Sequence, residues 1–264
     1  MVFSIDFSGK NYVVTGGNRG IGLAISRAIA DAGGSVAILY RSSPDAEQVA
    51  ANLSESHPGQ QFKAYKCDVT DQARVQEVFQ EVLKDFKGGM IHGVVANAGV
   101  AIVRDALEIG QEEFDFMYKT NVLGVFFTAQ AAAKIWKEKD YKTGAIVVIS
   151  SMSSQIYNQE GLNKPLKHVF YNSSKAAVSS MSKALAAEWA PYGIRVNIVS
   201  PGYVMTEQSG VHPKEVREFQ SNSVPLGRYS DPQEQTSQVI LLLSEHSSYQ
   251  TGSEVFIDGG YLIW

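Results

Sequence analysis

The stretch TGGNRGIG at residues 15–22 decides the fold of this chain. It joins an apolar run, NYVVTG at residues 11–16, to an amphipathic segment at residues 21–32. Glycines let the backbone turn tightly, and the free N–H groups at a helix start attract a phosphate. The order of strand, glycine turn and helix therefore predicts a site for the pyrophosphate of a dinucleotide. The residues expected to contact it are Gly16, Asn18, Arg19, Gly20, Ile21 and Gly22.

The same alternation of short apolar runs and longer periodic segments continues along the chain. Strand-like runs lie at residues 11–16, 35–40, 63–69, 92–99, 144–151, 195–202 and 254–260, and helical segments lie at 21–32, 71–87, 112–139, 171–192 and 233–244. Apolar strands separated by helices indicate a parallel sheet covered on both faces. We predict an α/β fold, a Rossmann-type doubly wound parallel sheet of about seven strands with helices on both faces. No repeat or linker interrupts it, so residues 1–264 are predicted to form a single domain.

Composition excludes several classes of protein. Hydrophobic residues make up 44% and charged residues 19%, and the net charge of −4 argues against nucleic-acid binding. No apolar run has the length of a membrane span, and the first residues lack a signal-peptide pattern. The single cysteine, Cys67, is predicted to be structural, and the isolated histidines predict no metal site. We expect a cytoplasmic protein.

Arg41 occupies the position after the second predicted strand, about twenty residues beyond the glycines, where NAD sites usually carry an acid. Together with Arg19, Ser42 and Ser43 it could surround a 2′-phosphate, which favours NADP(H). The alternative is that Arg41 merely begins a solvated loop. Later strand ends are expected to contact the rest of the cofactor: Asp68 and Val69 the adenine, and Asn97, Ala98 and Gly99 the ribose.

Tyr171 and Lys175 are four positions apart at the start of a predicted helix, so they share one face. A nearby ammonium, joined by a positive nicotinamide ring, would lower the pKa of the phenol and suit it to proton transfer. The alternative is a surface aromatic beside a solvated lysine. Serines 150, 151, 153 and 154 follow a strand just upstream, outside any G-x-S-x-G frame, so a serine hydrolase is not indicated. Asn121 is either a helix–helix hydrogen bond or part of a proton relay.

These motifs, together with PGYVMT at residues 201–206, resemble the short-chain dehydrogenase/reductase family over essentially the whole chain. The resemblance implies Tyr171 as acid–base, Lys175 as its pKa modifier and ribose holder, and Ser151 as the group that orients the carbonyl. It further implies that Asn121 anchors a relay water and that the enzyme is a homotetramer. Residues implied to lie along the nicotinamide and its phosphates are Pro201, Gly202, Val204 and Thr206.

The strings SSMSSQIYNQ, VFYNSSKAA and FIDGGYLIW are similar to a subgroup, the fungal NADP-dependent mannitol 2-dehydrogenases. The subgroup implies interconversion of D-fructose and D-mannitol, with sorbose, xylulose or a non-sugar ketone as alternative substrates. A different alternative is an NADP-binding regulatory protein without turnover. The polar loop at residues 155–168, which carries Gln155, Asn158, Gln159, Asn163 and His168, is expected to set the substrate preference. Ser153, Asn158 and His168 are the predicted substrate contacts. The apolar end at residues 261–264 is expected to meet a neighbouring subunit, with packing on its own subunit as the alternative.

Overall fold

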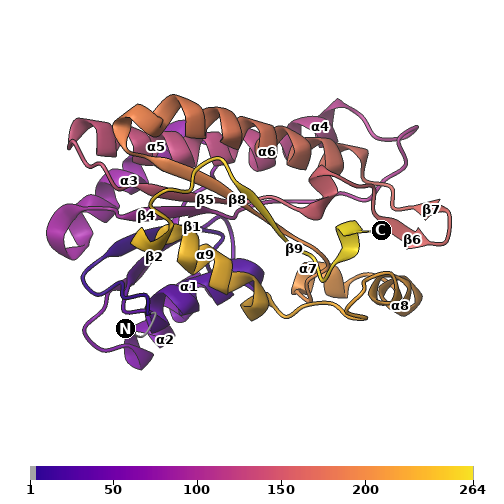
Figure 1. Ribbon diagram of the computed structural model, residues 1–264, viewed down its shortest axis with the longest axis horizontal. Helices are drawn as coiled ribbons and strands as arrows, with labels where there is room; N and C mark the ends of the chain where they lie inside the picture. Colours follow the sequence, from indigo (N-terminus) through magenta and orange to yellow (C-terminus); the bar gives the residue numbers. More distant parts are fainter. Residues whose placement is uncertain (1–3, 264) are drawn as a thin grey trace.

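The computed structural model of the protein describes residues 4–263, and its centre is a seven-stranded sheet (Figure 1). The strand order is β3-β2-β1-β4-β5-β8-β9, and every pairing is parallel. The strands are β1 Asn11–Thr15, β2 Ser35–Tyr40, β3 Phe62–Lys66, β4 Gly93–Ala96, β5 Ala145–Ile149, β8 Arg195–Pro201 and β9 Glu254–Ile257. The predicted α/β class and the doubly wound parallel sheet are confirmed.

Helices cover both faces of this sheet (Figure 1). One layer contains α3 Gln72–Asp85, α5 Gly124–Glu138 and α6 Val169–Trp189; the other contains α1 Gly20–Asp31, α2 Ala46–Ser56 and α9 Thr236–Leu243. Side chains alternate along each strand, so Val13 joins the first core and Val14 the second. Because both faces of the central strands β1, β4 and β5 are buried, these strands read as continuous apolar runs in the sequence.

Strand β1 pairs with β2 on one side and with β4 on the other, so the strand order reverses beside β1. Ligands of open α/β sheets bind at such a reversal, beyond the carboxyl ends of the strands. The turn at residues 16–19 leaves β1 at that point and leads directly into α1. The topology therefore brings the glycine turn to the ligand-binding edge.

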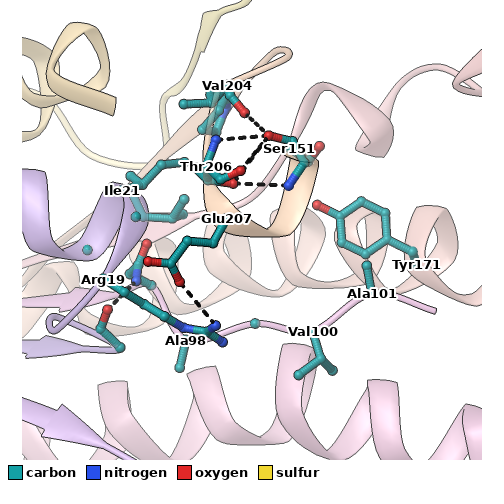
Figure 2. A pocket seen from close by; sticks show the side chains of 18 of the residues that line it. Arg19, Ile21, Ala98, Val100, Ala101, Ser151, Tyr171, Val204, Thr206 and Glu207 are labelled. Carbon is teal, nitrogen blue, oxygen red and sulfur yellow. Dashed lines mark hydrogen bonds and ion pairs between the residues drawn. The ribbon is translucent and has the colours of Figure 1, made fainter. Parts of the chain in front are cut away.

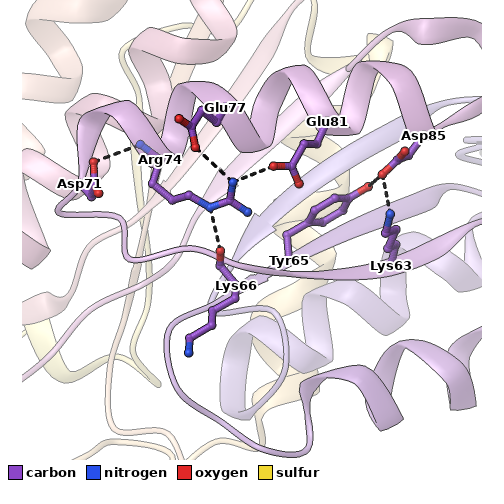
Figure 3. Close-up of polar contacts among 8 residues, drawn as sticks. All are labelled: Lys63, Tyr65, Lys66, Asp71, Arg74, Glu77, Glu81 and Asp85. Carbon is purple, nitrogen blue, oxygen red and sulfur yellow. Dashed lines mark hydrogen bonds and ion pairs between the residues drawn. The ribbon is translucent and has the colours of Figure 1, made fainter.

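Polar contacts fasten α3 to the edge strand β3 (Figure 3). The Arg74 guanidinium donates to the Lys66 carbonyl at 3.1 Å and to Glu81 at 2.6 Å, while Lys63 and Tyr65 both donate to Asp85. None of the residues that make these contacts lines the ligand-binding cavity, so their role is structural.

The structure differs from the predicted elements in three places. The predicted helix 112–139 is α4 Gln111–Tyr118 followed by a π-helical turn, Lys119–Leu123, and then α5. Helix α2 and two further helices, α7 Glu207–Gly210 and α8 Lys214–Asn222, were not predicted. The loop 155–168 contains a small antiparallel hairpin, β6 Gln159–Gly161 with β7 Lys164–Pro165. Polar surface helices and very short strands carry weak periodic signals, which explains these omissions.

The described part of the C-terminal end packs partly on its own chain. Tyr261 stacks edge-on against Tyr203 at 5.5 Å, whereas Ile263 is 78% exposed. The prediction for Trp264 lies outside the described residues. Within residues 4–263, no helix is both long enough and apolar enough to cross a membrane.

Candidate active site

A cavity of about 850 Å³ opens at the carboxyl ends of the strands. That volume lies within the usual range for small-molecule and cofactor sites. Three of the four predicted catalytic residues line it, namely Ser151, Tyr171 and Lys175. It is also lined by Gly16, Asn18, Arg19, Gly20, Ile21, Gly22, Arg41, Ser42, Ser43, Asp68, Val69, Asn97, Ala98, Gly99, Pro201, Gly202, Val204 and Thr206, which are all the other predicted cofactor residues.

The glycine turn that precedes α1 has no room for a side chain at its glycine positions. A Cβ on Gly22 would lie 2.1 Å from the Gly16 carbonyl oxygen, and Gly16 itself has φ +64°. Helix α1 begins after Arg19 without a side-chain cap. Its first N–H groups are therefore available to an anion, and the residues present fit a dinucleotide pyrophosphate.

Asn97, at the end of β4, holds this turn in place. Its side-chain Nδ2 donates to the carbonyl of Thr15 at 2.9 Å, and its backbone N–H donates to the Thr15 hydroxyl oxygen at 2.9 Å. Asp68, beyond β3, accepts from the N–H and hydroxyl of Thr70, which fixes the carboxylate at the cavity wall. Both residues line the cavity, and hydrogen bonds to neighbouring residues hold their side chains in place.

Two guanidinium groups stand at the cofactor end of the cavity. Arg41 follows β2 directly and lies 5.7 Å above the Phe116 ring, without an ion pair to any residue between 4 and 263. Figure 2 shows Arg19 reaching from the glycine turn to Glu207 of α7, at 3.8 Å between Nη1 and Oε2. Both arginines are exposed and could turn toward a 2′-phosphate, but Glu207 competes for one of them.

Ser151 and Tyr171 meet across the cavity (Figure 2). Ser151 follows β5, and Tyr171 lies in the first turn of α6. Burial raises the pKa of the Tyr171 phenol above its ordinary value, and a hydrogen bond with Ser151 opposes that rise. The pair therefore holds a proton on Tyr171, next to a serine hydroxyl, at the point where a carbonyl oxygen would bind.

Lys175 lies one helical turn beyond Tyr171, with its Nζ 5.7 Å from the centre of the phenol ring. Its ammonium donates to the Ile149 carbonyl at 3.0 Å, and burial lowers its pKa to about 8. The protein's own groups thus do not produce the predicted lowering of the Tyr171 pKa by Lys175, because desolvation dominates both residues. An effect that includes a charged nicotinamide ring stays a prediction.

Asn121 lies behind the cavity wall, in the π-helical turn, and is 1% exposed. Its amide accepts from the Val100 N–H at 2.8 Å and donates to the Val100 carbonyl at 2.9 Å and the Ser174 hydroxyl at 3.0 Å. Of the two predicted roles, the structure shows the first: Asn121 makes hydrogen bonds between elements, including one to Ser174 of helix α6. It fixes the segment after β4 against α6, and the relay role stays a prediction.

The predicted substrate residues form one buried hydrogen-bonded group beside Tyr171. The Ser153 hydroxyl donates to Asn158 Oδ1 at 2.6 Å, and His168 Nε2 lies 3.1 Å from the same oxygen. Ser151 donates to Ser153 at 3.0 Å, so the group is continuous with the catalytic serine. The other polar residues of the loop lie elsewhere: Gln155 and Asn163 are exposed, and Gln159 accepts from Gln220 through its backbone carbonyl.

Tyr203, Gln220 and Tyr229 are among the cavity residues that were not predicted. The Tyr229 hydroxyl donates to Gln220, and that side chain in turn bonds to the hairpin at Gln159. Tyr203 lies within the PGYVMT motif, so its place in the cavity could have been predicted from that motif. Gln220 and Tyr229 lie in and after α8, a segment without a motif.

The arrangement can bind a carbonyl oxygen and exchange a proton with it. Ser151 offers a hydrogen-bond donor, Tyr171 carries the proton, and the Lys175 ammonium lies on the same side. Within residues 4–263, no group of three or more His, Cys, Asp or Glu side chains could hold a metal ion. Cys67 is buried and burial raises its pKa to about 12, which is expected of an unreactive core thiol.

Comparisons with known proteins agree with this geometry. Residues 16–262 match a family model described as enoyl-(acyl carrier protein) reductase. Sorbose reductase of Candida albicans is 41% identical over 96% of this chain and 87% of its own length, and a probable NADP-dependent mannitol dehydrogenase of Yarrowia lipolytica is 38% identical over the same shares. The crystal structure of a short-chain type dehydrogenase/reductase from Mycobacterium marinum is 40% identical, covers 97% of both chains and superposes with a TM-score of 0.88. The chain therefore belongs to the short-chain dehydrogenase/reductase family of oxidoreductases.

Proposed function

We propose that this oxidoreductase uses NADP(H) to interconvert a ketose and a polyol, with D-fructose and D-mannitol as the first candidates. The observation that carries the proposal is the hydrogen-bonded group of Ser153, Asn158 and His168 beside Ser151 and Tyr171. Leaving buried polar groups unpaired costs about 1–3 kcal/mol each, so such a wall favours a substrate that carries hydroxyl groups.

The cofactor assignment rests on charge at the end of β2. Arg41 stands where an acid would hold the ribose 2′-OH of NAD, and Ser42, Ser43 and Arg19 line the same cavity. When bound, NADP(H) supplies or accepts the hydride. The glycine turn would hold its pyrophosphate, and Lys175 and the segment that contains Pro201 and Thr206 would hold its nicotinamide half. The name of the Yarrowia relative supports this cofactor.

The proton steps belong to the chain itself. In reduction, the Ser151 hydroxyl would turn from Ser153 to the carbonyl oxygen, and Tyr171 would give its proton to that oxygen. Because burial favours the protonated phenol, Tyr171 is ready to act as an acid. In oxidation the alcohol's proton would return to Tyr171, and the Lys175 ammonium would stabilise the phenolate.

The names of the two fungal relatives support the ketose class but point to different sugars. The decisive test is NADPH oxidation by the purified enzyme with D-fructose, sorbose, xylulose and an apolar ketone such as cyclohexanone. We expect a ketose to have the highest kcat/KM, with D-fructose first. The Tyr171→Phe variant is the control for background oxidation. A higher kcat/KM for cyclohexanone than for every ketose would contradict the proposal.

A reductase for a non-sugar ketone is the second candidate, because one part of the cavity is apolar. Val103, Leu166 and Val211 line it, and Val211 is 79% exposed. The same assay separates the two functions. We further propose a cytoplasmic homotetramer formed by a single-domain chain. Light scattering on the purified protein tests the tetramer, and deletion of residues 261–264 tests whether the C-terminal end contributes to it.

A further inference from the structure

We propose that His168 and Asn158 form a subsite for the hydroxyl group on the carbon next to the reacting carbonyl, so that the substrates are α-hydroxyketones and their vicinal diols. The inference rests on the proposed ketose function and narrows it. It assigns the preference to two side chains and to one substrate hydroxyl rather than to the polarity of the loop as a whole.

The hydrogen bonds fix what each side chain can offer. Asn158 Oδ1 is a pure acceptor, so the His168 nitrogen 3.1 Å away, Nε2, carries a proton. Burial, and then the charge of His212, lowers the pKa of His168 to about 4, so the ring is neutral at pH 7. A neutral imidazole with its proton on Nε2 has a bare lone pair on Nδ1. His168 therefore presents an acceptor, and Asn158 presents its amide hydrogens as donors.

His168 Nδ1 and Asn158 Nδ2 remain available to a ligand. Among residues 4–263, His168 Nδ1 and Asn158 Nδ2 make no hydrogen bond of normal geometry, although Asn158 approaches the Tyr203 hydroxyl. The fully buried side-chain atoms without a partner in that part of the chain are the Tyr203 hydroxyl and Gln235 Oε1. Since the two nitrogens are not among them, they keep access to the cavity that both residues line. A hydroxyl both donates and accepts, so one hydroxyl can satisfy the pair.

The position of His168 selects the adjacent carbon. Its ring stacks on Tyr171, with centroids 5.1 Å apart and an angle of 22° between the planes. Tyr171 delivers the proton to the carbonyl oxygen, so a group beside its ring meets the nearest neighbour of that oxygen along the substrate. The Asn158 bond to Ser153, which holds Ser151, fixes the subsite against the other carbonyl-binding residue.

The test compares two ketones that differ by one hydroxyl, 1-hydroxy-2-butanone and 2-butanone, by the ratio of their kcat/KM values. We expect the parent enzyme to prefer the hydroxyketone strongly. His168→Phe keeps a ring to stack on Tyr171 but removes both nitrogens, and should lower the ratio by about 10- to 100-fold. Asn158→Leu should lower it by a similar factor. Gln155→Leu is the matched control: this polar residue lies in the same loop but is exposed and does not line the cavity, so the ratio should stay within about twofold of the parent.

NADPH binding, followed by fluorescence, and thermal unfolding establish that each variant is folded. If both His168→Phe and Asn158→Leu slow the two ketones equally, the residues only position Tyr171 and Ser151, and the subsite is wrong. If the parent enzyme reduces ketoses yet does not distinguish the two butanones, the subsite is also wrong while the proposed function stands. If the parent reduces no ketose at all, the proposed function itself fails.

Discussion

Replacing Arg41 by Asp should convert an enzyme that prefers NADPH into one that does not. Arg41 has no ion pair with residues 4–263, so the cost comes from the cofactor and not from the fold. Loss of one charge-assisted hydrogen bond to an exposed phosphate costs about 1.5 kcal/mol, and repulsion by the new carboxylate adds roughly 1 kcal/mol. At about 1.4 kcal/mol per factor of ten, NADPH affinity should fall by about 30- to 150-fold.

The neutral variant Arg41→Gln isolates the first of these contributions and should weaken NADPH by about tenfold. Binding of NADH should be unchanged by Gln and improved by Asp, because a carboxylate can accept from the ribose 2′-OH. Titration of each cofactor into the parent and both variants measures these constants directly. If the ratio of NADPH to NADH affinity stays within about threefold of the parent in both variants, Arg41 does not contact the 2′-phosphate.

Four further predictions concern Tyr171, Lys175, the Glu207 carboxylate opposite Arg19, and the buried Glu254. Tyr171→Phe should lower kcat by at least about 10³-fold with NADPH affinity nearly unchanged, measured by steady-state kinetics and titration; a variant that keeps more than a tenth of the rate would place the acid elsewhere. Because burial lowers the pKa of Lys175 to about 8, its ammonium is lost as the pH rises through that value, so kcat/KM for ketone reduction should fall above pH 8; a flat profile to pH 10 would contradict this. Glu207→Gln should tighten NADPH roughly twofold by releasing Arg19, with no effect on NADH; weaker NADPH binding would show that Glu207 helps to hold the cofactor. The Glu254 carboxylate accepts hydrogen bonds from Ser179, Ser200 and Lys183; burial tends to raise its pKa, but these bonds lower it below its ordinary value. Glu254→Gln should therefore lower the free energy of unfolding in urea by about 1–3 kcal/mol at pH 7, and by less as the pH falls toward the pKa of the carboxyl. An equal loss at pH 4 and pH 7 would exclude an ionic origin.

The sheet and the residues at its binding edge could be predicted from the sequence alone. Seven strand-like runs separated by helical segments indicate a covered parallel sheet, and the carboxyl ends of parallel strands meet at one edge. That rule was enough to collect four residues at one cavity, because each lies within two residues of the end of its strand: Arg41, Asp68, Asn97 and Ser151. The Tyr171–Lys175 pair needed only the helical spacing of four residues.

Which polar residues of the loop 155–168 reach the cavity depends on the tertiary structure. The β6–β7 hairpin lies between Asn158 and His168, which both contact the Ser153 group, whereas Gln155 and Asn163 are exposed and do not line the cavity. Sequence composition cannot separate them, since all are polar and the strands are too short to show a period. Gln220 enters the site from α8 and Tyr229 from the segment after it, a part of the chain far from the loop and without a motif.

The protonation of the site was likewise decided by packing and not by residue type. Adjacency of Lys175 to Tyr171 suggested a lowered phenol pKa, but burial acts on both groups and favours the neutral form of each. The π-helical turn around Asn121 could not be predicted from the sequence either. Asn121 makes hydrogen bonds to Val100 and Ser174, which belong to separate elements of the fold. Local spacing determines which residues share a face, whereas desolvation and long-range hydrogen bonds depend on everything that the fold packs around them.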